Sequence, residues 1–213
     1  MDSKAHLVRH AESVHNVTHD FSQLDPDLTP LGLRQATGLG QLFPYAPQVG
    51  VIITSPLKRA VQTTLTAFPH ILDKRYFDSE SGHGVEDGAA LFLDPDLQER
   101  SALPCDTGSP TKVLEAAFPR LGFQDLAEGW QVKEDLYSAA DEAVEERALR
   151  VRSRIAAIGQ DLQHQRRTDV VVVTHGVFMK VLLGDPDIDL PKAGWRSYAV
   201  GTHSSGVILS PLE

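Results

Sequence analysis

The sequence is poor in cysteine, in aromatic residues and in long apolar runs. Its 213 residues include one cysteine and two tryptophans, and 7% of them are aromatic. The single cysteine, Cys105, excludes an intrachain disulfide, which suits a reducing compartment. The first ten residues hold no apolar core of signal-peptide length, and apolar runs such as 170–173 are far too short to cross a bilayer. We therefore expect a cytoplasmic protein that does not contact membranes.

Basic residues are also fewer than acidic ones. Lysine and arginine total 20 against 29 aspartates and glutamates, which gives a formal net charge of −9. A nucleic-acid-binding face needs a basic surplus, so we expect no nucleic-acid partner. A few arginines and histidines can still form a small positive pocket for an anion in an acidic protein. The length suits one domain with a sizeable core.

Several β-branched and apolar runs predict strands. Residues 49–54 (VGVIIT) and 169–174 (DVVVVT) lack polar alternation, which is typical of parallel strands buried on both faces. Residues 5–8 form a shorter run that stops at Arg9-His10, and two further strands are expected at 197–200 and 205–209.

Helix starts are well marked. Three dipeptides place an N-cap hydroxyl before a proline suited to the first helical position, namely Thr29-Pro30, Ser55-Pro56 and Ser109-Pro110. They predict helices that end near residues 42, 68 and 117. A long amphipathic helix is expected at about 139–164, and a last one begins after Gly176 and ends near Gly184.

Strands that alternate with helices predict a three-layer α/β/α sandwich around a mostly parallel sheet. We expect one domain over residues 1–213. The stretch at about 73–130 has weak periodicity and many Gly, Pro and Asp residues, so we interpret it as an insertion that covers the site.

Polar side chains follow three of the expected strands. Arg9 and His10 end the first, Arg59 lies just beyond the second, and His175 follows the valine-rich strand. Because sites in open α/β sheets form beyond the carboxyl ends of strands, these side chains are expected to meet in one crevice. Two arginines, two histidines and the N-terminus of a helix describe a phosphate pocket, since a guanidinium binds two phosphate oxygens at once.

Four blocks of sequence resemble the histidine phosphatase (phosphoglycerate mutase-like) superfamily. L-V-R-H-A-E-S-V-H-N at residues 7–16 is similar to the signature R-H-G-E-x-x-x-N, and L-T-P-L-G-L-R-Q-A at 28–36 matches the segment after it. S-P-L-K-R-A-V-Q-T at 55–63 and V-T-H-G at 173–176 match the second arginine and second histidine motifs. A lone R-H pair is weak, whereas four blocks in order over nearly the whole chain are a specific signal.

The resemblance implies a role for each matching residue. His10 attacks phosphorus and becomes phosphohistidine. Arg9 and Arg59 hold the phosphoryl oxygens, and His175 stabilises the charge that develops on them. Asn16 orients or binds the phosphoryl group. One departure stands out: Ala11 occupies the place of the usual glycine, and alanine tolerates fewer backbone conformations.

The resemblance also implies an acidic proton donor in the inserted stretch. Glu99, in L-Q-E at 97–99, resembles the L-x-E form of that element. Other carboxylates compete for the role: Glu86, Asp87, Asp94, Asp96 and Asp106. Ser22 follows Phe21 where the family often has a substrate-contacting hydroxyl, although a loop serine has the same appearance. Gly176 completes V-T-H-G and is assigned to the substrate site.

Two other chemistries find little support in the sequence. Residues 106–109 spell the D-T-G-S of aspartic proteases, but these need two such carboxylates and only one copy exists. The histidines at 6, 10, 15 and 19 suggest a metal, but there is no H-E-x-x-H and no cysteine cluster. We expect neither a metal nor another cofactor.

The leading hypothesis is a metal-independent phosphomonoesterase that acts on a small phosphorylated substrate, with inorganic phosphate as its product. A phosphoglycerate-type phosphomutase and a catalytically weak phosphoryl-binding or regulatory module are the alternatives. A mutase must keep the phosphorylated enzyme from water, which generally needs longer insertions. The sequence selects neither the substrate nor the oligomeric state, since one fold hosts many substrates.

Overall fold

A six-stranded sheet forms the centre of the computed structural model, which describes residues 3–203 and 206–212. The strand order is β3-β2-β4-β1-β5-β6. Strands β1 to β4 run parallel, and β5 and β6 are antiparallel to their neighbours. The strands are β1 (Lys4–Arg9), β2 (Val49–Thr54), β3 (Ala90–Leu93), β4 (Asp169–Thr174), β5 (Trp195–His203) and β6 (Gly206–Pro211).

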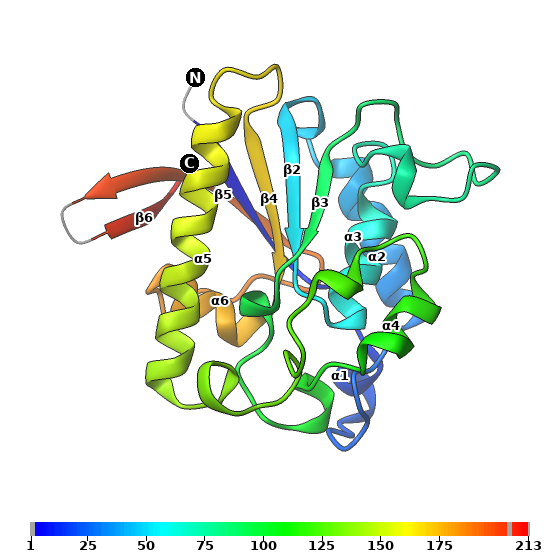
Figure 1. Ribbon diagram of the computed structural model, residues 1–213, viewed down its shortest axis with the longest axis vertical. Coiled ribbons are helices and arrows are strands. Elements are labelled where there is room, and N and C mark those ends of the chain that lie inside the picture. The colour runs from blue at the N-terminus through cyan, green and yellow to red at the C-terminus, as the bar shows by residue number, and fades with distance from the viewer. Residues whose placement is uncertain (1–2, 204–205, 213) are drawn as a thin grey trace.

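Helices cover both faces of the sheet. On one side α5 and α6 pack over the strands, and on the other lie α2 and α3 (Figure 1). Two separate apolar clusters result, because the central strands are buried on both faces. The helices are α1 (Val14–Thr18), α2 (Pro30–Leu42), α3 (Lys58–Ala67), α4 (Thr111–Ala117), α5 (Asp141–Leu162) and α6 (Gly176–Leu183).

The three-layer α/β/α fold predicted from the sequence is confirmed. Of the expected last strand at 205–209, residue 205 lies outside the described residues, and β6 continues to Pro211. No pattern in the sequence predicts α1 or β3, and β3 has four residues and lies inside the expected insertion. No helix within the described ranges is both long and apolar enough to cross a membrane.

Two of the three expected helix caps are wrong. Thr29 does cap α2, because its Oγ1 accepts a hydrogen bond from the Gly32 amide at 2.9 Å. The third helix starts only at Lys58, and the Ser55 hydroxyl instead lies 2.8 Å from His175 Nε2. Ser109 does not cap α4, which begins after Pro110 without a side-chain cap. Ser55, in the turn between β2 and α3, therefore contacts His175 instead of capping the helix.

Strand register brings the chemically important residues to one level. Arg9 pairs with Thr174 across β1 and β4, and Thr54 pairs with Val173 across β4 and β2. The next residues are His10 after β1, His175 after β4 and Ser55 after β2. Since all three strands are parallel, these residues leave the sheet at the same edge, at the lower end of the strands in Figure 1.

Helices α2 and α3 approach each other closely through a glycine. A Cβ built on Gly40 would lie 1.9 Å from the Ala67 carbonyl oxygen, so only glycine fits there. Two residues earlier, a Cβ on Gly38 would meet nothing within 4 Å. The two glycines therefore differ in packing, although both lie inside the same helix.

We expect Gly40→Ala to lower the free energy of unfolding by roughly 1–3 kcal/mol, because backbone atoms must move to admit the methyl group. Gly38→Ala should raise it by about 0.5–1 kcal/mol, because alanine loses less conformational entropy in a helix. Urea denaturation of both variants checks this. Equal effects of the two substitutions would contradict the close approach of α2 and α3.

Candidate active site

His10 is buried immediately beyond β1, with both ring nitrogens engaged. Its Nδ1 lies 2.7 Å from the Ala11 carbonyl oxygen. A carbonyl oxygen only accepts, so Nδ1 carries the proton and Nε2 presents a lone pair. Arg59 Nε donates to that Nε2 at 3.3 Å. The imidazole is thereby fixed in the tautomer that a nucleophile attacking through Nε2 requires.

Burial is the main reason why the pKa of His10 is held well below its ordinary value. The positive charges of Arg59 and Lys192 lower it further, and the hydrogen bond to Ala11 opposes them. An imidazole with a lowered pKa stays neutral in slightly acidic solution. His10 is therefore a neutral imidazole at physiological pH.

Two guanidinium groups flank His10 from different elements. Arg59, in the first turn of α3, is 1% exposed and also donates to the Cys105 carbonyl oxygen at 2.6 Å. Arg9, at the end of β1, donates to Asp189 Oδ1 at 2.7 Å and to the Leu190 carbonyl oxygen at 2.5 Å. Each group can bind two oxygens of a tetrahedral anion.

His175 lies beside His10, with their ring centroids 5.0 Å apart. Its Nε2 contacts the Ser55 hydroxyl at 2.8 Å, and its buried Nδ1 has no hydrogen-bond partner among the described residues. Burial, then Arg59 and then His10 lower its pKa well below the ordinary value. A Cβ on the next residue, Gly176, would lie 3.0 Å from the Arg9 guanidinium, so glycine leaves room for that side chain.

Asn16 is held at the edge of the cavity by its neighbours. Its Oδ1 accepts from the Ser13 amide at 3.2 Å, and its Nδ2 donates to His15 Nε2 at 3.0 Å. Burial and then Arg59 lower the pKa of His15 to about 4, so this second imidazole is also neutral. The amide of Asn16 thus lines the cavity as a donor group.

Glu99 reaches the cavity from the segment that follows β3. Its Oε1 accepts from the amides of Phe178 and Arg100, both at 2.8 Å, and its Oε2 accepts from the Val177 amide at 3.1 Å. The first and last of these contacts lie in the first turn of α6, where a carboxylate is favoured by the helix dipole. Because Oε2 accepts one bond, its second lone pair is left for a proton.

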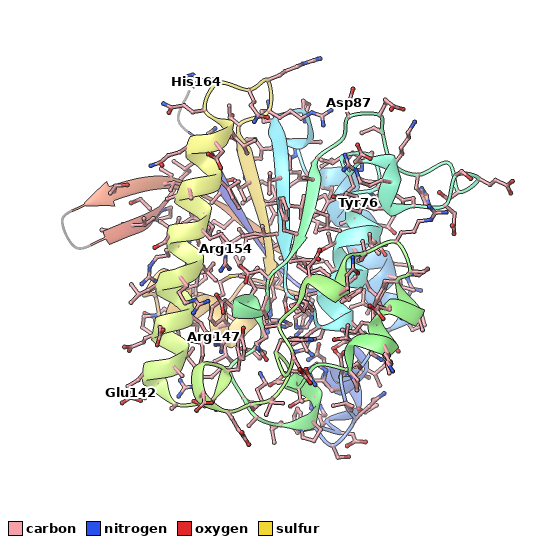
Figure 2. All side chains as sticks on the ribbon, viewed as in Figure 1. Tyr76, Asp87, Glu142, Arg147, Arg154 and His164 are labelled. Carbon is pink, nitrogen blue, oxygen red and sulfur yellow. The ribbon has the colours of Figure 1, made fainter. Side chains whose placement is uncertain are left out.

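A row of arginines on α5 anchors the segment that carries Glu99. Arg147 NH1 donates to the carbonyl oxygens of Asp96 and Gln98 at 2.9 and 2.8 Å. Arg154 pairs with Asp94 and Asp96 in the same segment. Both arginines project from α5 towards the centre of the molecule (Figure 2). The helix therefore positions Glu99 through its backbone neighbours.

Comparisons with known proteins identify the family of the chain. The sequence profile of the histidine phosphatase superfamily (branch 1) matches residues 5–73 and 82–210. The chain belongs to this superfamily. A putative phosphoserine phosphatase 2 of Hydrogenobacter thermophilus is 30% identical over 81% of this chain and 73% of that protein. A probable phosphatase of Schizosaccharomyces pombe is 26% identical over 90% of this chain and 85% of that protein.

A solved structure shares the fold of this histidine phosphatase. Mycobacterial glucosyl-3-phosphoglycerate phosphatase, in a complex with VO3, superposes with a TM-score of 0.58. The match covers 99% of this chain and 97% of that one at 20% identity. At that identity the likeness supports the architecture alone.

Two sequence expectations about the loops change in this histidine phosphatase. Ser22 is exposed and donates to Asp20 Oδ1 at 2.6 Å, whereas the neighbouring Phe21 lines the cavity. The hydroxyl is thus not brought together with the other site residues. Ala11 needs no positive φ, its side chain is fully buried, and its amide donates to Thr63 Oγ1 at 3.0 Å. Alanine fits this loop.

The cavity of ≈ 400 Å³ also contains residues that sequence reasoning missed. Lys192 lines it, and burial followed by Arg9 and Arg59 lowers the pKa of that lysine to about 8. Lys192 lies in an irregular segment before β5, where no motif marks it. Further lining residues without a predicted role are His15, Phe21, Ser101, Leu103, Cys105, Val177, Lys180 and Asp189. Asp106, a competing candidate for the proton donor, lines the cavity as well.

One group of potential metal ligands lies in the cavity wall. Atoms of His15, Cys105 and Asp106 lie within 4.8 Å of one another. Burial and then Asp106 raise the pKa of the Cys105 thiol to about 11, so it is not a ready thiolate. Asp106 is already paired with Arg59 at 2.8 Å. A buried cation at these ligands would also face the Arg59 charge, so the donor set fits a metal poorly.

Three buried histidines should make this histidine phosphatase less stable as the pH falls. The folded state keeps His10, His15 and His175 neutral, whereas the unfolded chain binds protons to them below about pH 6.5. The free energy of unfolding should therefore drop between pH 7.5 and 5.5, by roughly 1 kcal/mol for each histidine. Urea titrations at both pH values measure it.

The variant His10→Gln isolates one of the three contributions. It has no imidazole at position 10, so its stability should decline less over the same interval than that of the wild-type protein. An identical pH dependence in the two proteins would show that His10 is not held neutral by the fold.

Proposed function

We propose that the protein is a phosphomonoesterase that forms a phosphohistidine on His10. One observation supports this most directly: Nδ1 donates to the Ala11 carbonyl oxygen, and Nε2 presents its lone pair beside Arg59. A nucleophile needs an unprotonated lone pair, and fixed positive charge near the phosphoryl oxygens stabilises the transfer. His10 Nε2 has that lone pair, and the Arg59 Nε–H that contacts it at 3.3 Å turns to a phosphoryl oxygen when substrate binds.

The proposed reaction has two steps. In the first, Nε2 of His10 forms a bond to phosphorus and the bond from phosphorus to the ester oxygen breaks. In the second, a water oxygen attacks the same phosphorus, the N–P bond breaks and inorganic phosphate leaves. Covalent catalysis of this kind divides one difficult displacement into two easier ones.

Positive groups around His10 stabilise the transferred phosphoryl group. Arg9 and Arg59 line the cavity and supply guanidinium donors, and His175, whose ring centroid lies 5.0 Å from that of His10, has an orphan Nδ1. These groups spread charge over the equatorial oxygens of the transferred phosphoryl group. We therefore propose that the reaction needs no metal ion.

Glu99 is the proposed proton donor to the leaving oxygen. The carboxyl group lines the same cavity as His10, and its Oε2 has a lone pair that no amide uses. In the second step the same group takes a proton from the attacking water. General acid–base catalysis of this kind contributes typically ~10²–10⁴-fold.

The substrate is proposed to be a small phosphorylated molecule. The cavity measures ≈ 400 Å³, which suits a metabolite-sized ester. Two similar proteins are named as phosphatases for phosphoserine and for glucosyl-3-phosphoglycerate. A cytoplasmic location and the absence of nucleic-acid partners stay predictions from the sequence.

Hydrolysis of an aryl phosphate in excess chelator tests the proposal. Wild-type protein should release phosphate at an unchanged rate when chelator is added, and His10→Ala should lose at least about 10³-fold in kcat, because the nucleophile is gone. Glu99→Gln should slow alkyl phosphates far more than the aryl phosphate, whose leaving group needs little protonation.

Each alternative function gives a different outcome. Full activity of His10→Ala contradicts the phosphohistidine, and loss of activity in chelator contradicts metal independence. Isomer formation from a phosphoglycerate without phosphate release indicates a mutase. Phosphate binding without turnover indicates a regulatory module. Acid-labile labelling at His10 argues against pure binding.

A further inference from the structure

Asp106 contacts Arg59, the proposed phosphate-binding group, but has no role in the proposed reaction. Its Oδ1 accepts a hydrogen bond from Arg59 NH2 at 2.8 Å, and its carboxylate lines the same cavity as His10. In the sequence this aspartate is one of six acidic candidates and the first residue of D-T-G-S, with no assigned function. Its contact with Arg59 gives it a specific place in the site.

The contact occupies the edge of the guanidinium that a phosphoryl group needs. Nε and NH2 of Arg59 lie on one edge, which can bridge two oxygens of a tetrahedral anion. Nε contacts His10 Nε2 at 3.3 Å, and NH2 contacts Asp106 Oδ1 at 2.8 Å. A phosphoryl group on His10 Nε2 must place its oxygens at this same edge. The Asp106 carboxylate therefore stands where an oxygen of the substrate would bind.

The carboxylate is held firmly in this position. Ser101 Oγ donates to its Oδ2 at 2.6 Å, and the Asp106 amide donates to the Leu103 carbonyl oxygen at 2.9 Å. Its side chain is only 12% exposed, whereas that of Asp189, which pairs with Arg9, is 75% exposed. A buried ion pair is screened much less than an exposed one. Asp106 therefore competes far more strongly for its arginine than Asp189 does.

We propose that Asp106 is a built-in competitor of the phosphoryl group for Arg59, and that it weakens the binding of inorganic phosphate so that the product leaves. This rests on the proposed function, because it assumes that the phosphoryl group binds at Arg59. The negative charge of phosphate meets a fixed negative charge at its binding edge. Phosphate binding then requires that NH2 exchange Asp106 for a phosphate oxygen. Asp106 acts through Arg59 and is a positioning residue.

The variant Asp106→Asn tests the competition. The amide keeps the size of the side chain, and its oxygen can still accept from Arg59 or Ser101, but the charge is lost. Calorimetric titration with inorganic phosphate should show a Kd roughly tenfold lower than that of the wild-type protein, since a hydrogen bond to a charged group is stronger than one to a neutral group. Product inhibition by phosphate should strengthen by the same factor.

Asp27→Asn is the matched control. Asp27 pairs with Lys58, the residue next to Arg59, at 3.4 Å, and 52% of its side chain is exposed. The substitution removes the same charge close by but outside the cavity. Its phosphate Kd should stay within about twofold of the wild-type value, because an exposed pair is worth little. Equal tightening in both variants would mean that net charge, not competition at Arg59, controls binding.

Ser101→Ala covers the case in which Asp106→Asn does not fold. It removes the hydroxyl that holds Oδ2 and should also tighten phosphate binding, though less. An unchanged phosphate Kd in folded Asp106→Asn, or in Ser101→Ala if Asp106→Asn does not fold, overturns the proposal. So does a fall in alkyl phosphate turnover with unchanged phosphate binding, which would make Asp106 a proton donor.

The same titration separates this proposal from the proposed function. If wild-type protein binds phosphate and hydrolyses esters but Asp106→Asn does not bind phosphate more tightly, only the competition at Arg59 is wrong. If neither wild type nor Asp106→Asn binds phosphate, both proposals fail. Loss of binding in Arg59→Ala shows that the titrated site is the one described here.

Discussion

The site depends on the hydrogen bond from Arg59 Nε to Nε2 of a buried, neutral His10. The contact orients the imidazole and brings a permanent positive charge to the atom that we propose as the nucleophile. It also helps to lower the pKa of His10, because a second positive charge beside Arg59 is unfavourable. The Ala11 carbonyl oxygen completes the arrangement by holding the proton on Nδ1. Arg59 and the Ala11 carbonyl oxygen therefore set the orientation and tautomer of the ring, and burial together with Arg59 keeps it neutral.

Concentrating cations in an acidic protein creates an electrostatic conflict within the cavity. Arg9, Arg59 and Lys192 all line it, and the pKa of Lys192 is lowered to about 8 by burial and the two arginines. The two arginines are paired with Asp189 and Asp106. A pocket of this kind must bind a phosphate ester and yet release inorganic phosphate. Carboxylates beside the arginines are one way to keep the affinity for the product low.

Much of the fold could be predicted from sequence, because the responsible signals are local. Apolar runs marked β2 and β4, and the spacing of apolar residues marked α5. The signals failed for β3, whose four residues are too few to show a period, and for α1, with five residues. Ser55 looked like a helix cap, but a nearby histidine uses its hydroxyl. Tertiary contacts decided these cases.

Some residues of the candidate site could be predicted from the sequence and others could not. His10, Arg59 and His175 follow strands whose order and direction can be inferred, so their convergence was predictable. Lys192 enters the cavity from an irregular segment and Asp106 from a three-residue 3-10 helix, and no pattern in the sequence specifies where such short pieces fold. The contacts of the arginine row on α5 with the Glu99 segment could not be predicted either, because the partners are distant in sequence.

Nitrogen-15 NMR of the histidine side chains at pH 6 tests the central claim most directly. The account predicts that the His10 ring is neutral, with a proton on Nδ1 and none on Nε2. His10→Gln identifies the resonances. An imidazolium at residue 10 at this pH, or a neutral ring protonated on Nε2, would contradict it.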